Sequence, residues 1–541
     1  MHTRGSLWNW RGWGPLRALT IASITLIPLL VVFSAFLDPQ PETWSHLSEY
    51  VLPGVLWNTL VLTLGVGACV LLLGVPLAWL TAVCDFPGRR FFSWSLMLPL
   101  AMPAYVLAFV QVGLFDFTGP VQTFIRDWVG SSSWFPPIRS TGGVVLVLSL
   151  AFYPYVYLLA RNAFITQGLR ALEAAQVLGY TRFQAFWKVA LPMARPWIAG
   201  GLTLALMETL ADFGSVSIFS YDTFTTAIYK AWFSLFNLSA ASQLASLLVT
   251  VVLVLAVVDQ RLRKNRRYAA KNFSPARIEL KGATRWFAVV FCGFVLATAF
   301  VVPMIQLAMW VADVWKTDFD VRYPVFLWHS LLLAGLAAVA VTILGLLLSA
   351  INQHHKDAST QVIVRLATLG YAIPGTVLAV GVFIPIAWLD NQLITLAAWL
   401  GFDYPQILKG SILVMLIALS ARFLAVAFQP VDAAMQRITG NQTNAARSLG
   451  LSPKQVLLRL QLPMVRGGLL SAALIVFVDV MKEMPITLMT RPFGWDTLAV
   501  RVFEMTSEGM WDRAALPSLA IVMAGLLPVI LLIRKSESDF H

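Results

Sequence analysis

The sequence has few charged residues and few cysteines, and each shortage excludes classes of protein to which the chain could belong. Only 12% of its 541 residues are charged, about half the share found in a soluble domain. With 58% of residues hydrophobic, this composition excludes a cytosolic enzyme and a disordered chain. The three cysteines form neither a disulfide framework nor a Cys-x-x-Cys metal motif. No Gly-x4-Gly-Lys-Ser/Thr phosphate-binding loop is present, so we do not expect the chain to hydrolyse ATP itself.

What the sequence contains instead is a series of long apolar runs. A helix needs roughly 20 apolar residues to cross a bilayer. Such runs predict an all-α polytopic membrane protein with about 12 transmembrane helices. The expected spans lie near residues 17–37, 57–82, 92–115, 143–160, 197–219, 241–258, 287–311, 329–351, 364–388, 410–428, 467–489 and 515–533.

The net charge of +12 is unevenly distributed along the chain. The densest basic stretch, residues 261–285, lies between two apolar runs, which is typical of a cytoplasmic loop. The distribution of Lys and Arg over the other loops places both termini in the cytoplasm. We interpret the basic stretch as a linker anchored at anionic membrane lipid in preference to a regulatory site. No nucleic acid partner is expected, because the basic residues do not form a folded face with interleaved aromatics.

The two halves of the chain are related by a constant shift of 271 residues. Pro103 corresponds to Pro374, and Thr226 corresponds to Thr497. Each half has six expected spans, so both copies insert with the same orientation, and such parallel repeats place a pathway between them. The predicted domains are a first half at 1–260, a basic linker at 261–286 and a second half at 287–541. The most informative loops fall at 161–195 and 429–466.

Those two loops carry the same motif. Its members are Glu173, Ala174, Ala175, Gly179, Leu191 and Pro192 in the first half and Asn444, Ala445, Ala446, Gly450, Leu462 and Pro463 in the second. An alanine pair followed by glycine is typical of a helix that ends in the left-handed conformation. Thr181 and Ser452 each have a glutamine three residues later, which predicts a capping box at the start of another short helix. We expect Pro192 and Pro463 to end that helix before the next span.

This doubled helix–glycine–helix pattern resembles the Glu-Ala-Ala loop of the inner-membrane permeases of binding-protein-dependent ABC importers. The resemblance implies a type I ABC importer permease fold with two parallel six-helix repeats in a bacterial inner membrane. It implies that the loops are coupling helices, which seat in clefts on two subunits of a separate cytoplasmic ATPase. ATP and Mg²⁺ are then used by that partner, and this chain itself is expected to bind no cofactor. A periplasmic or extracellular solute-binding protein is the other expected partner.

One position departs from the family pattern. Asn444 stands where the family usually has glutamate, so an ionic contact inferred for Glu173 is not expected to recur in the second half. The effect of this difference on the two ATPase contacts stays open.

Two acidic pairs lie within expected spans, where an ionisable group costs roughly 2.5–3.5 kcal/mol at the bilayer centre. Glu208 and Asp212 are four residues apart, as are Asp479 and Glu483, so each pair is expected on one helix face. One hypothesis is that all four line the translocation path and transiently bind a hard cation such as Fe(III). The alternative is that they tie spans together, pairing with Lys482 or capping backbone breaks near Gly214 and Pro485.

Two further groups have a functional and a structural interpretation. Tyr153 and Tyr157 offer phenol oxygens to the path, although aromatic residues commonly pack between helices. His354 and His355 lie in a short loop between spans, where we expect them to be solvated.

Among permeases with two fused halves, the chain is most similar to those for iron(III). This similarity rests on segments 207–214, 218–233 and 239–245. Permeases for thiamine, phosphonate or polyamine remain alternatives. A secondary transporter also has twelve spans and parallel repeats, although it does not require the doubled coupling motif.

Overall fold

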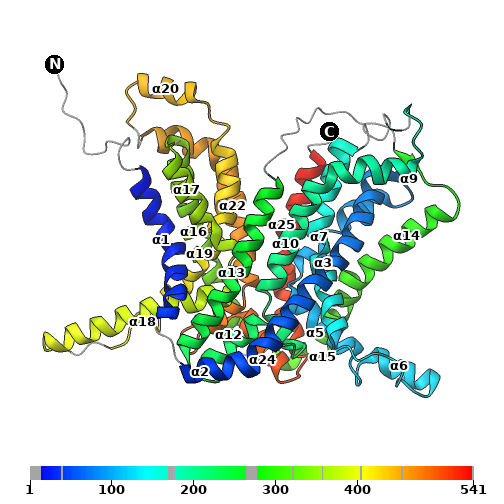
Figure 1. The fold of residues 1–541 in the computed structure, drawn as a ribbon, viewed down its shortest axis with the longest axis horizontal. Coiled ribbons are helices and arrows are strands. Elements are labelled where there is room, and N and C mark those ends of the chain that lie inside the picture. Colours follow the sequence, from blue (N-terminus) through cyan, green and yellow to red (C-terminus); the bar gives the residue numbers. More distant parts are fainter. Residues whose placement is uncertain are drawn as a thin grey trace. The chain divides into compact units, whose positions relative to one another are not determined.

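The computed structural model describes residues 14–37, 41–168, 175, 177–263, 277–319, 322–355, 357–402, 405–452 and 455–538. Helices make up nearly all of its regular structure (Figure 1). In the described part of the chain, eleven helical segments are long and apolar enough to cross a membrane, and Ala515–Leu526 is a shorter apolar helical stretch. The expected all-α polytopic fold is confirmed.

The elements of the first part of the chain end at α13. They are α1 (Gly14–Ser34), η1 (Ala35–Leu37), α2 (Pro41–His46), η2 (Leu47–Val51), α3 (Leu52–Val83), β1 (Cys84–Asp85), α4 (Arg89–Ser95), η3 (Leu98–Ala101), α5 (Ala104–Phe115), α6 (Pro120–Val129), α7 (Thr141–Ala163), η4 (Phe164–Gly168), α9 (Arg182–Ala185), η5 (Phe186–Ala190), α10 (Leu191–Ala211), α11 (Gly214–Ile218), α12 (Phe224–Phe233) and α13 (Leu238–Arg263).

The elements of the second part begin at β2. They are β2 (Ile278–Glu279), α14 (Ala283–Leu296), η6 (Ala297–Val301), α15 (Val302–Asp318), α16 (Tyr323–His354), α17 (Ala358–Ala367), η7 (Thr368–Ala372), α18 (Gly375–Trp399), α19 (Ile412–Met435), α20 (Gly440–Ser448), η8 (Val456–Gln461), α22 (Leu462–Lys482), α23 (Pro485–Thr490), α24 (Leu498–Ser507) and α25 (Ala515–Ser538).

The backbone follows the internal repeat closely. Helices α3 and α16 both have 32 residues, and α10 and α22 both have 21. Each pair begins and ends at positions separated by the same shift of 271 residues. The repeat inferred from a few prolines and a loop motif therefore extends to the bounds of the longest helices.

Two expected spans are interrupted where the prediction had them continuous. In the expected spans 92–115 and 364–388, a short helix and a 3-10 turn precede Pro103 and Pro374, and only then do α5 and α18 begin. Proline lacks the N–H that a continuous helix requires and disfavours helical backbone in the residue before it. Both prolines instead take the N-cap position with ψ of 143° and 142°.

The described residues form two compact units that interleave along the sequence. One contains residues from Met1–Trp44, Ile228–Val249 and Val321–Val500, and the other contains residues from Ser45–Ala227, Thr250–Asp320 and Arg501–His541. The first span is therefore grouped with helices of the second sequence half. The boundaries predicted at 260 and 287 divide the repeat in sequence and stay predictions.

In the first unit, side-chain contacts hold α1, the first span, against helices of the second sequence half. Helix α1 lies beside α16 and α19 (Figure 1). Ala18 and Ala22 of α1 belong to a buried apolar cluster with Leu348 of α16 and Leu424 of α19. The hydroxyl of Thr25 donates to the carbonyl oxygen of Ala367 at 3.1 Å. Small residues on α1 allow this close approach, as is usual between membrane helices.

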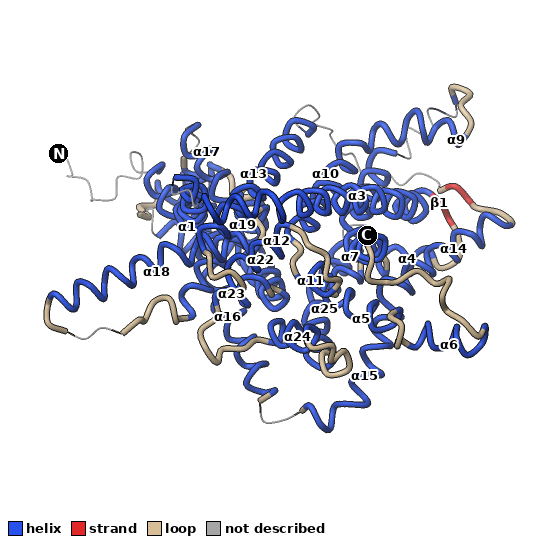
Figure 2. Tube along the Cα trace, turned by 60° about the horizontal axis from the view of Figure 1, so that its bottom comes forward, coloured by secondary structure: helices blue, strands red, loops and turns tan. Residues whose placement is uncertain are grey.

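The second unit holds the corresponding span of the other half in the same way. The side-chain amide of Gln111 in α5 donates to the carbonyl oxygen of Thr298 at 2.9 Å. Phe109 stacks with Trp310 of α15, with ring centroids 6.2 Å apart. Strand β1 pairs with β2 in parallel, beside α14 (Figure 2). In both repeats, the first span thus packs with helices of the other sequence half, and we call this arrangement the exchange of first spans.

Candidate functional site: coupling loops and buried charges

The first coupling loop is described at Ala175, its third motif residue, and again from Val177 onward. Glu173 and Ala174 lie outside the described residues. Gly179 has a φ of +86°, the left-handed conformation that glycine adopts without strain. The N–H of Tyr180 donates to the carbonyl oxygen of Ala175 at 3.0 Å, which closes the end of the helix as in a Schellman motif.

The second coupling loop has the same turn. Asn444, Ala445 and Ala446 lie on α20, and Gly450 has a φ of +85°. The N–H of Leu451 donates to the carbonyl oxygen of Ala446 at 3.2 Å. The predicted left-handed glycine is confirmed in both copies.

Both predicted capping boxes are also present. The N–H of Thr181 donates to the side-chain oxygen of Gln184 at 3.1 Å, and the N–H of Gln184 donates back to the Thr181 hydroxyl at 3.3 Å. Ser452 and Gln455 make the same exchange at 2.8 and 3.4 Å. Each box satisfies two backbone N–H groups that the start of a helix leaves without an intrahelical acceptor.

The expectation that Pro192 and Pro463 end this second helix is wrong. The chain passes from η5 directly into α10, and from η8 directly into α22. In both π-helical turns the N–H of the residue before the proline, Leu191 or Leu462, donates to the carbonyl five residues earlier. The wider turn relieves the clash of a proline ring with the carbonyl four residues before it, so the helix continues.

Asn444 lines a cavity of about 670 Å³ together with the end of α19. On its wall, the carboxylate of Asp432 accepts hydrogen bonds from Ser349, Asn352 and Gln436 at 3.1, 3.1 and 2.7 Å. The repeat places Arg161 at the position of Asp432 in the first half. The two coupling loops therefore share the same turn, while these corresponding positions beside them carry opposite charges.

The acidic pairs do not lie on single helices as predicted. Helix α10 ends at Ala211, so Asp212 is its C-cap with a ψ of 129°. Helix α22 ends at Lys482, so Glu483 is its C-cap with a ψ of 114°. A spacing of four residues places two side chains on one helix face only where the helix continues through both residues. Here each helix ends just before the second acid.

Asp212 holds the start of the short helix α11. Its carboxylate accepts a hydrogen bond from the Ser215 hydroxyl at 2.8 Å and from the N–H of Val216 at 3.1 Å. Its own carbonyl oxygen accepts from the Thr225 hydroxyl at 2.6 Å. An acid at this position satisfies orphan N–H groups and complements the helix dipole. This is the capping geometry named as the alternative to a path-lining role.

Glu483 occupies the equivalent position before α23 and has a charged partner. Its carboxylate accepts from the N–H of Ile486 at 3.2 Å, and its other oxygen lies 3.3 Å from Nε of Arg422. Sequence reasoning considered Lys482 as a partner and missed Arg422. The sequence did indicate such a partner, because an arginine inside the apolar run 412–435 is costly in a membrane unless it is paired with an acid.

Glu208 and Asp479 lie within α10 and α22, in different compact units. Among the residues that the structure describes, no three His, Cys, Asp or Glu side chains come together to hold a metal. Transient metal binding by the four acids stays a prediction.

The two tyrosines are fully buried in the second unit. The hydroxyl of Tyr153 donates to the carbonyl oxygen of Leu96 at 2.9 Å, and that of Tyr157 donates to the carbonyl oxygen of Ser93 at 2.9 Å. These bonds tie α7 to the last turn of α4 and to its C-cap residue Leu96, just before η3. The geometry favours the packing interpretation, and a role in the path stays a prediction.

His355 is buried, contrary to the expectation that it is solvated. A Cβ atom built on Gly14 would lie 2.5 Å from its ring, and only 8% of the residue is exposed. The helix α1, which packs here from a distant part of the chain, covers the loop. No local pattern in the sequence indicates that contact.

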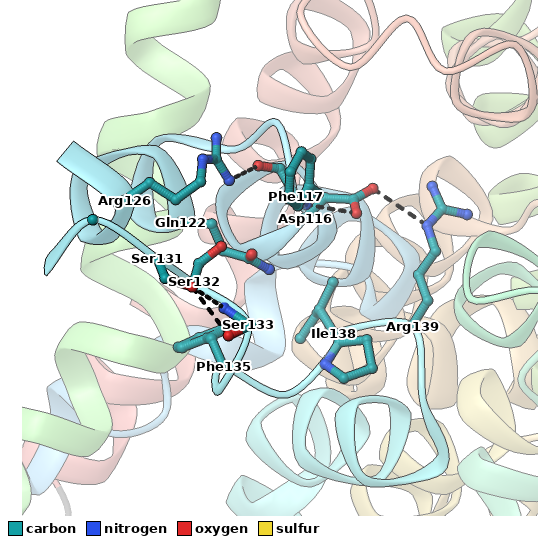
Figure 3. A pocket seen from close by; sticks show the side chains of 12 residues that line it. Asp116, Phe117, Gln122, Arg126, Ser131, Ser132, Ser133, Phe135, Ile138 and Arg139 are labelled. Atoms are coloured by element: carbon teal, nitrogen blue, oxygen red, sulfur yellow. Dashed lines mark hydrogen bonds and ion pairs between the residues drawn. The ribbon is translucent and has the colours of Figure 1, made fainter.

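A cavity of about 570 Å³ with charged and hydroxyl side chains in its wall lies near the start of α7, at the end remote from the first coupling loop. Figure 3 shows Arg126 directed toward Phe117 and Arg139 directed toward Asp116. Nη1 of Arg126 donates to the carbonyl oxygen of Phe117 at 2.7 Å, and Nε of Arg139 lies 3.5 Å from the carboxylate of Asp116. This loop was not singled out from the sequence.

The comparisons with known proteins agree with the doubled motif. The family of binding-protein-dependent transport system inner membrane components matches residues 74–264 and again residues 341–534. The chain belongs to this family. It is accordingly a multi-pass permease subunit of the bacterial inner membrane.

Several individual permeases are similar to it. An Fe(3+)-transport system permease protein of Haemophilus influenzae is 26% identical over 88% of this chain and 89% of its own length. A ferric transport system permease protein of Actinobacillus pleuropneumoniae is 23% identical over 71% of this chain and 57% of its own length. A molybdenum transport system permease protein of Escherichia coli is 27% identical over 38% of this chain and 90% of its own length.

Proposed function

We propose that this permease forms the translocation path of an ATP-driven importer for iron(III). The observation that carries the proposal is the doubled coupling loop, in which Gly179 and Gly450 have φ values of +86° and +85° and the same closing hydrogen bond follows each. A surface repeated in this way suits a partner with two equivalent clefts. The cargo is inferred from the ferric and Fe(3+) permeases that match most of the chain.

The energy comes from a separate cytoplasmic ATPase dimer that uses ATP and Mg²⁺. Its two subunits seat the coupling helices, and closure of the dimer draws these helices together and opens the path on the opposite face. A solute-binding protein delivers the cargo there. The distribution of Lys and Arg supports cytoplasmic termini and coupling loops.

The breaks at Asp212 and Glu483 support a path near the acidic pairs. Discontinuous helices are common at transporter binding sites, where half-helix ends and exposed backbone groups contact the cargo. In this arrangement Asp212 and Glu483 hold the breaks open as caps. Glu208 and Asp479, one turn earlier, supply the oxygen ligands that a hard cation prefers.

Uptake of radiolabelled ferric iron tests the proposal, in iron-starved cells with and without the gene. We expect deletion to abolish iron uptake and the wild-type gene to restore it. Thiamine, phosphonate, polyamine, molybdate and sulfate uptake are measured in parallel, because permeases named for the last two transport systems match part of the chain. Loss of another cargo alone would leave an ABC permease but refute iron.

A double variant distinguishes the proposed path-lining role of Glu208 and Asp479 from the capping role of Asp212 and Glu483. We expect Glu208→Gln/Asp479→Asn to lower iron uptake at least tenfold while assembly is retained, because Asp212 and Glu483 remain as caps. Unchanged uptake in an assembled variant would refute the path-lining role. Copurification tests the remaining alternative, a secondary transporter. We expect an ATPase to copurify with the permease, whereas a secondary transporter requires no ATPase and would be purified without one.

A further inference from the structure

An apolar groove lies in the second unit beside the first coupling loop. It has a volume of about 760 Å³ and is lined by side chains from α3, β1, η5, β2 and α14 together with Leu280. The lining residues are Pro76, Trp79, Leu80, Cys84, Phe186, Ile278, Leu280, Thr284, Phe287 and Phe291. Ten residues with a single hydroxyl among their side chains offer contacts for hydrocarbon and few for a polar ligand.

The end of the basic linker forms one wall of this groove. Cys84 pairs with Ile278 and Asp85 with Glu279 in the β1–β2 ladder, and the N–H of Leu280 donates to the carbonyl oxygen of Asp85 at 3.1 Å. These backbone bonds fix the linker end against the end of α3, next to α14 (Figure 2). The wall is therefore part of the folded unit.

Two basic residues flank this wall along the chain. Arg277 precedes the lining residue Ile278, and Lys281 follows the lining residue Leu280; both are exposed. Partial desolvation of its guanidinium and the neighbouring cation of Arg89 lower the pKa of Arg277, and Arg161 and Arg90 act in the same direction against the carboxylate of Asp85. That carboxylate is itself engaged by Arg89 at 3.2 Å. Arg277, Lys281 and Arg89 thus outnumber the carboxylates of Asp85 and Glu279, so the charge beside this mouth of the groove is net positive.

We propose that the groove binds an anionic phospholipid, with an acyl chain along its aromatic wall and the phosphate beside Arg277 and Lys281. A zwitterionic phospholipid offers the same chains but no net negative charge for the basic mouth. Clustered Lys and Arg beside a membrane helix attract anionic headgroups. The combination of a hydrocarbon groove with cations at one end fits this class of molecule.

The site is a property of the first repeat only. Trp79 corresponds to Ala350 in the second repeat, and Cys84 corresponds to His355. There Ala350 is buried in an apolar cluster with Met435 and Val465, and His355 packs against Gly14. The corresponding region of the second repeat is filled by protein side chains.

The bound lipid contacts the coupling machinery through Phe186. This residue lies two positions after Gln184 of the capping box, and its ring packs edge-on against Trp79 with centroids 4.6 Å apart. A chain lying on both rings restricts the π-helical turn that joins the coupling loop to α10. We therefore expect anionic lipid to favour productive coupling on this side of the permease.

Photo-crosslinking tests the site directly. The permease, purified with its ATPase, is placed in nanodiscs containing phosphatidylglycerol or phosphatidylcholine with a diazirine in the acyl chain. Crosslinked positions are mapped by mass spectrometry. We expect phosphatidylglycerol to label residues 76–84 and 284–291 about tenfold more than phosphatidylcholine does.

Two matched variants assign the selectivity to the basic mouth. Arg277→Gln/Lys281→Gln is expected to reduce phosphatidylglycerol labelling about tenfold, to the level of phosphatidylcholine. Lys316→Gln/Arg322→Gln removes the same charge from exposed positions in the last turn of α15 and at the N-cap of α16, and is expected to leave the labelling unchanged. Size-exclusion profiles establish that both variants assemble.

Three results would overturn the proposal. Equal labelling by the two lipids would make the groove an ordinary lipid-facing surface. An equal loss in both double variants would assign the effect to net charge. Absence of labelling in the groove with either lipid would show that protein, such as the ATPase partner, covers it.

Discussion

The Nε atom of Arg422 lies 3.3 Å from a carboxylate oxygen of Glu483, and both side chains are largely buried within one compact unit. The pair joins α19 to the break between α22 and α23. Nearby, a Cβ on Gly375 would lie 2.6 Å from the Glu483 carboxylate and 2.9 Å from the Arg422 guanidinium. The pair therefore fills the space at the start of α18 as well.

Removing one partner of this pair is expected to destabilise the permease strongly. Arg422→Met leaves a buried carboxylate, and Glu483→Gln leaves a buried guanidinium. In soluble proteins such changes cost about 3–5 kcal/mol, whereas replacing both partners costs much less. We expect Arg422→Met/Glu483→Gln to melt above either single variant. Melting temperatures of the detergent-solubilised protein measure this, and a double variant that melts below both would contradict it.

The backbone of the coupling turns makes a second prediction. Gly450 has a φ of +85°, and a Cβ there meets nothing within 4 Å, so alanine is opposed by backbone strain of about 1–2 kcal/mol and not by a clash. We expect Gly450→Ala to reduce ATPase stimulation by the loaded binding protein several-fold.

The matched control for that variant is Gly335→Ala. Gly335 lies inside α16 and also has open space at its Cβ, but there the helical backbone favours alanine by about 0.5–1 kcal/mol. Equal stimulation in the two variants would show that the left-handed turn does not matter for coupling.

These turns were predictable because their signals are local. A glycine after the alanine pair and a glutamine three residues after Thr181 or Ser452 each specify a conformation through neighbouring backbone groups. Apolar runs long enough to cross a bilayer likewise specify the spans. The doubled motif and the constant shift then gave the family without any knowledge of tertiary contacts.

The features that could not be predicted from the sequence depend mainly on contacts with residues far along the chain. The burial of His355 follows from Gly14 on α1, and the exchange of first spans follows from small residues such as Ala18 that suit a distant helix pair. The breaks at Asp212 and Glu483 were missed for another reason. A spacing of four is informative only inside a helix, and a buried acid is equally suited to end one.

The capping boxes make a third prediction, which concerns local opening. Ser452→Ala removes the hydroxyl that accepts the N–H of Gln455 at 3.4 Å, and loss of an N-cap costs about 1 kcal/mol. That change corresponds to roughly fivefold faster hydrogen exchange of amides in the first turn after Ser452. Ser452→Thr, which retains an acceptor, is expected to exchange like the wild type. Equal exchange in the alanine and threonine variants would refute a role for the box.

Asp357 makes the start of α17 sensitive to acid. One of its oxygens accepts from the Ser359 hydroxyl at 2.6 Å and from the N–H and hydroxyl of Thr360 at 2.9 and 2.8 Å, and these hydrogen bonds lower its pKa below the ordinary value of 3.8. Because the folded state lowers this pKa, the stabilisation is complete above pH 3.8 and is lost as the pH falls further. We expect amide exchange in α17, corrected for its intrinsic rate, to accelerate below about pH 4 in the wild type. Asp357→Asn has no proton to gain, so its corrected exchange is expected to stay level over the same range, and a parallel acceleration in that variant would assign the effect to another group.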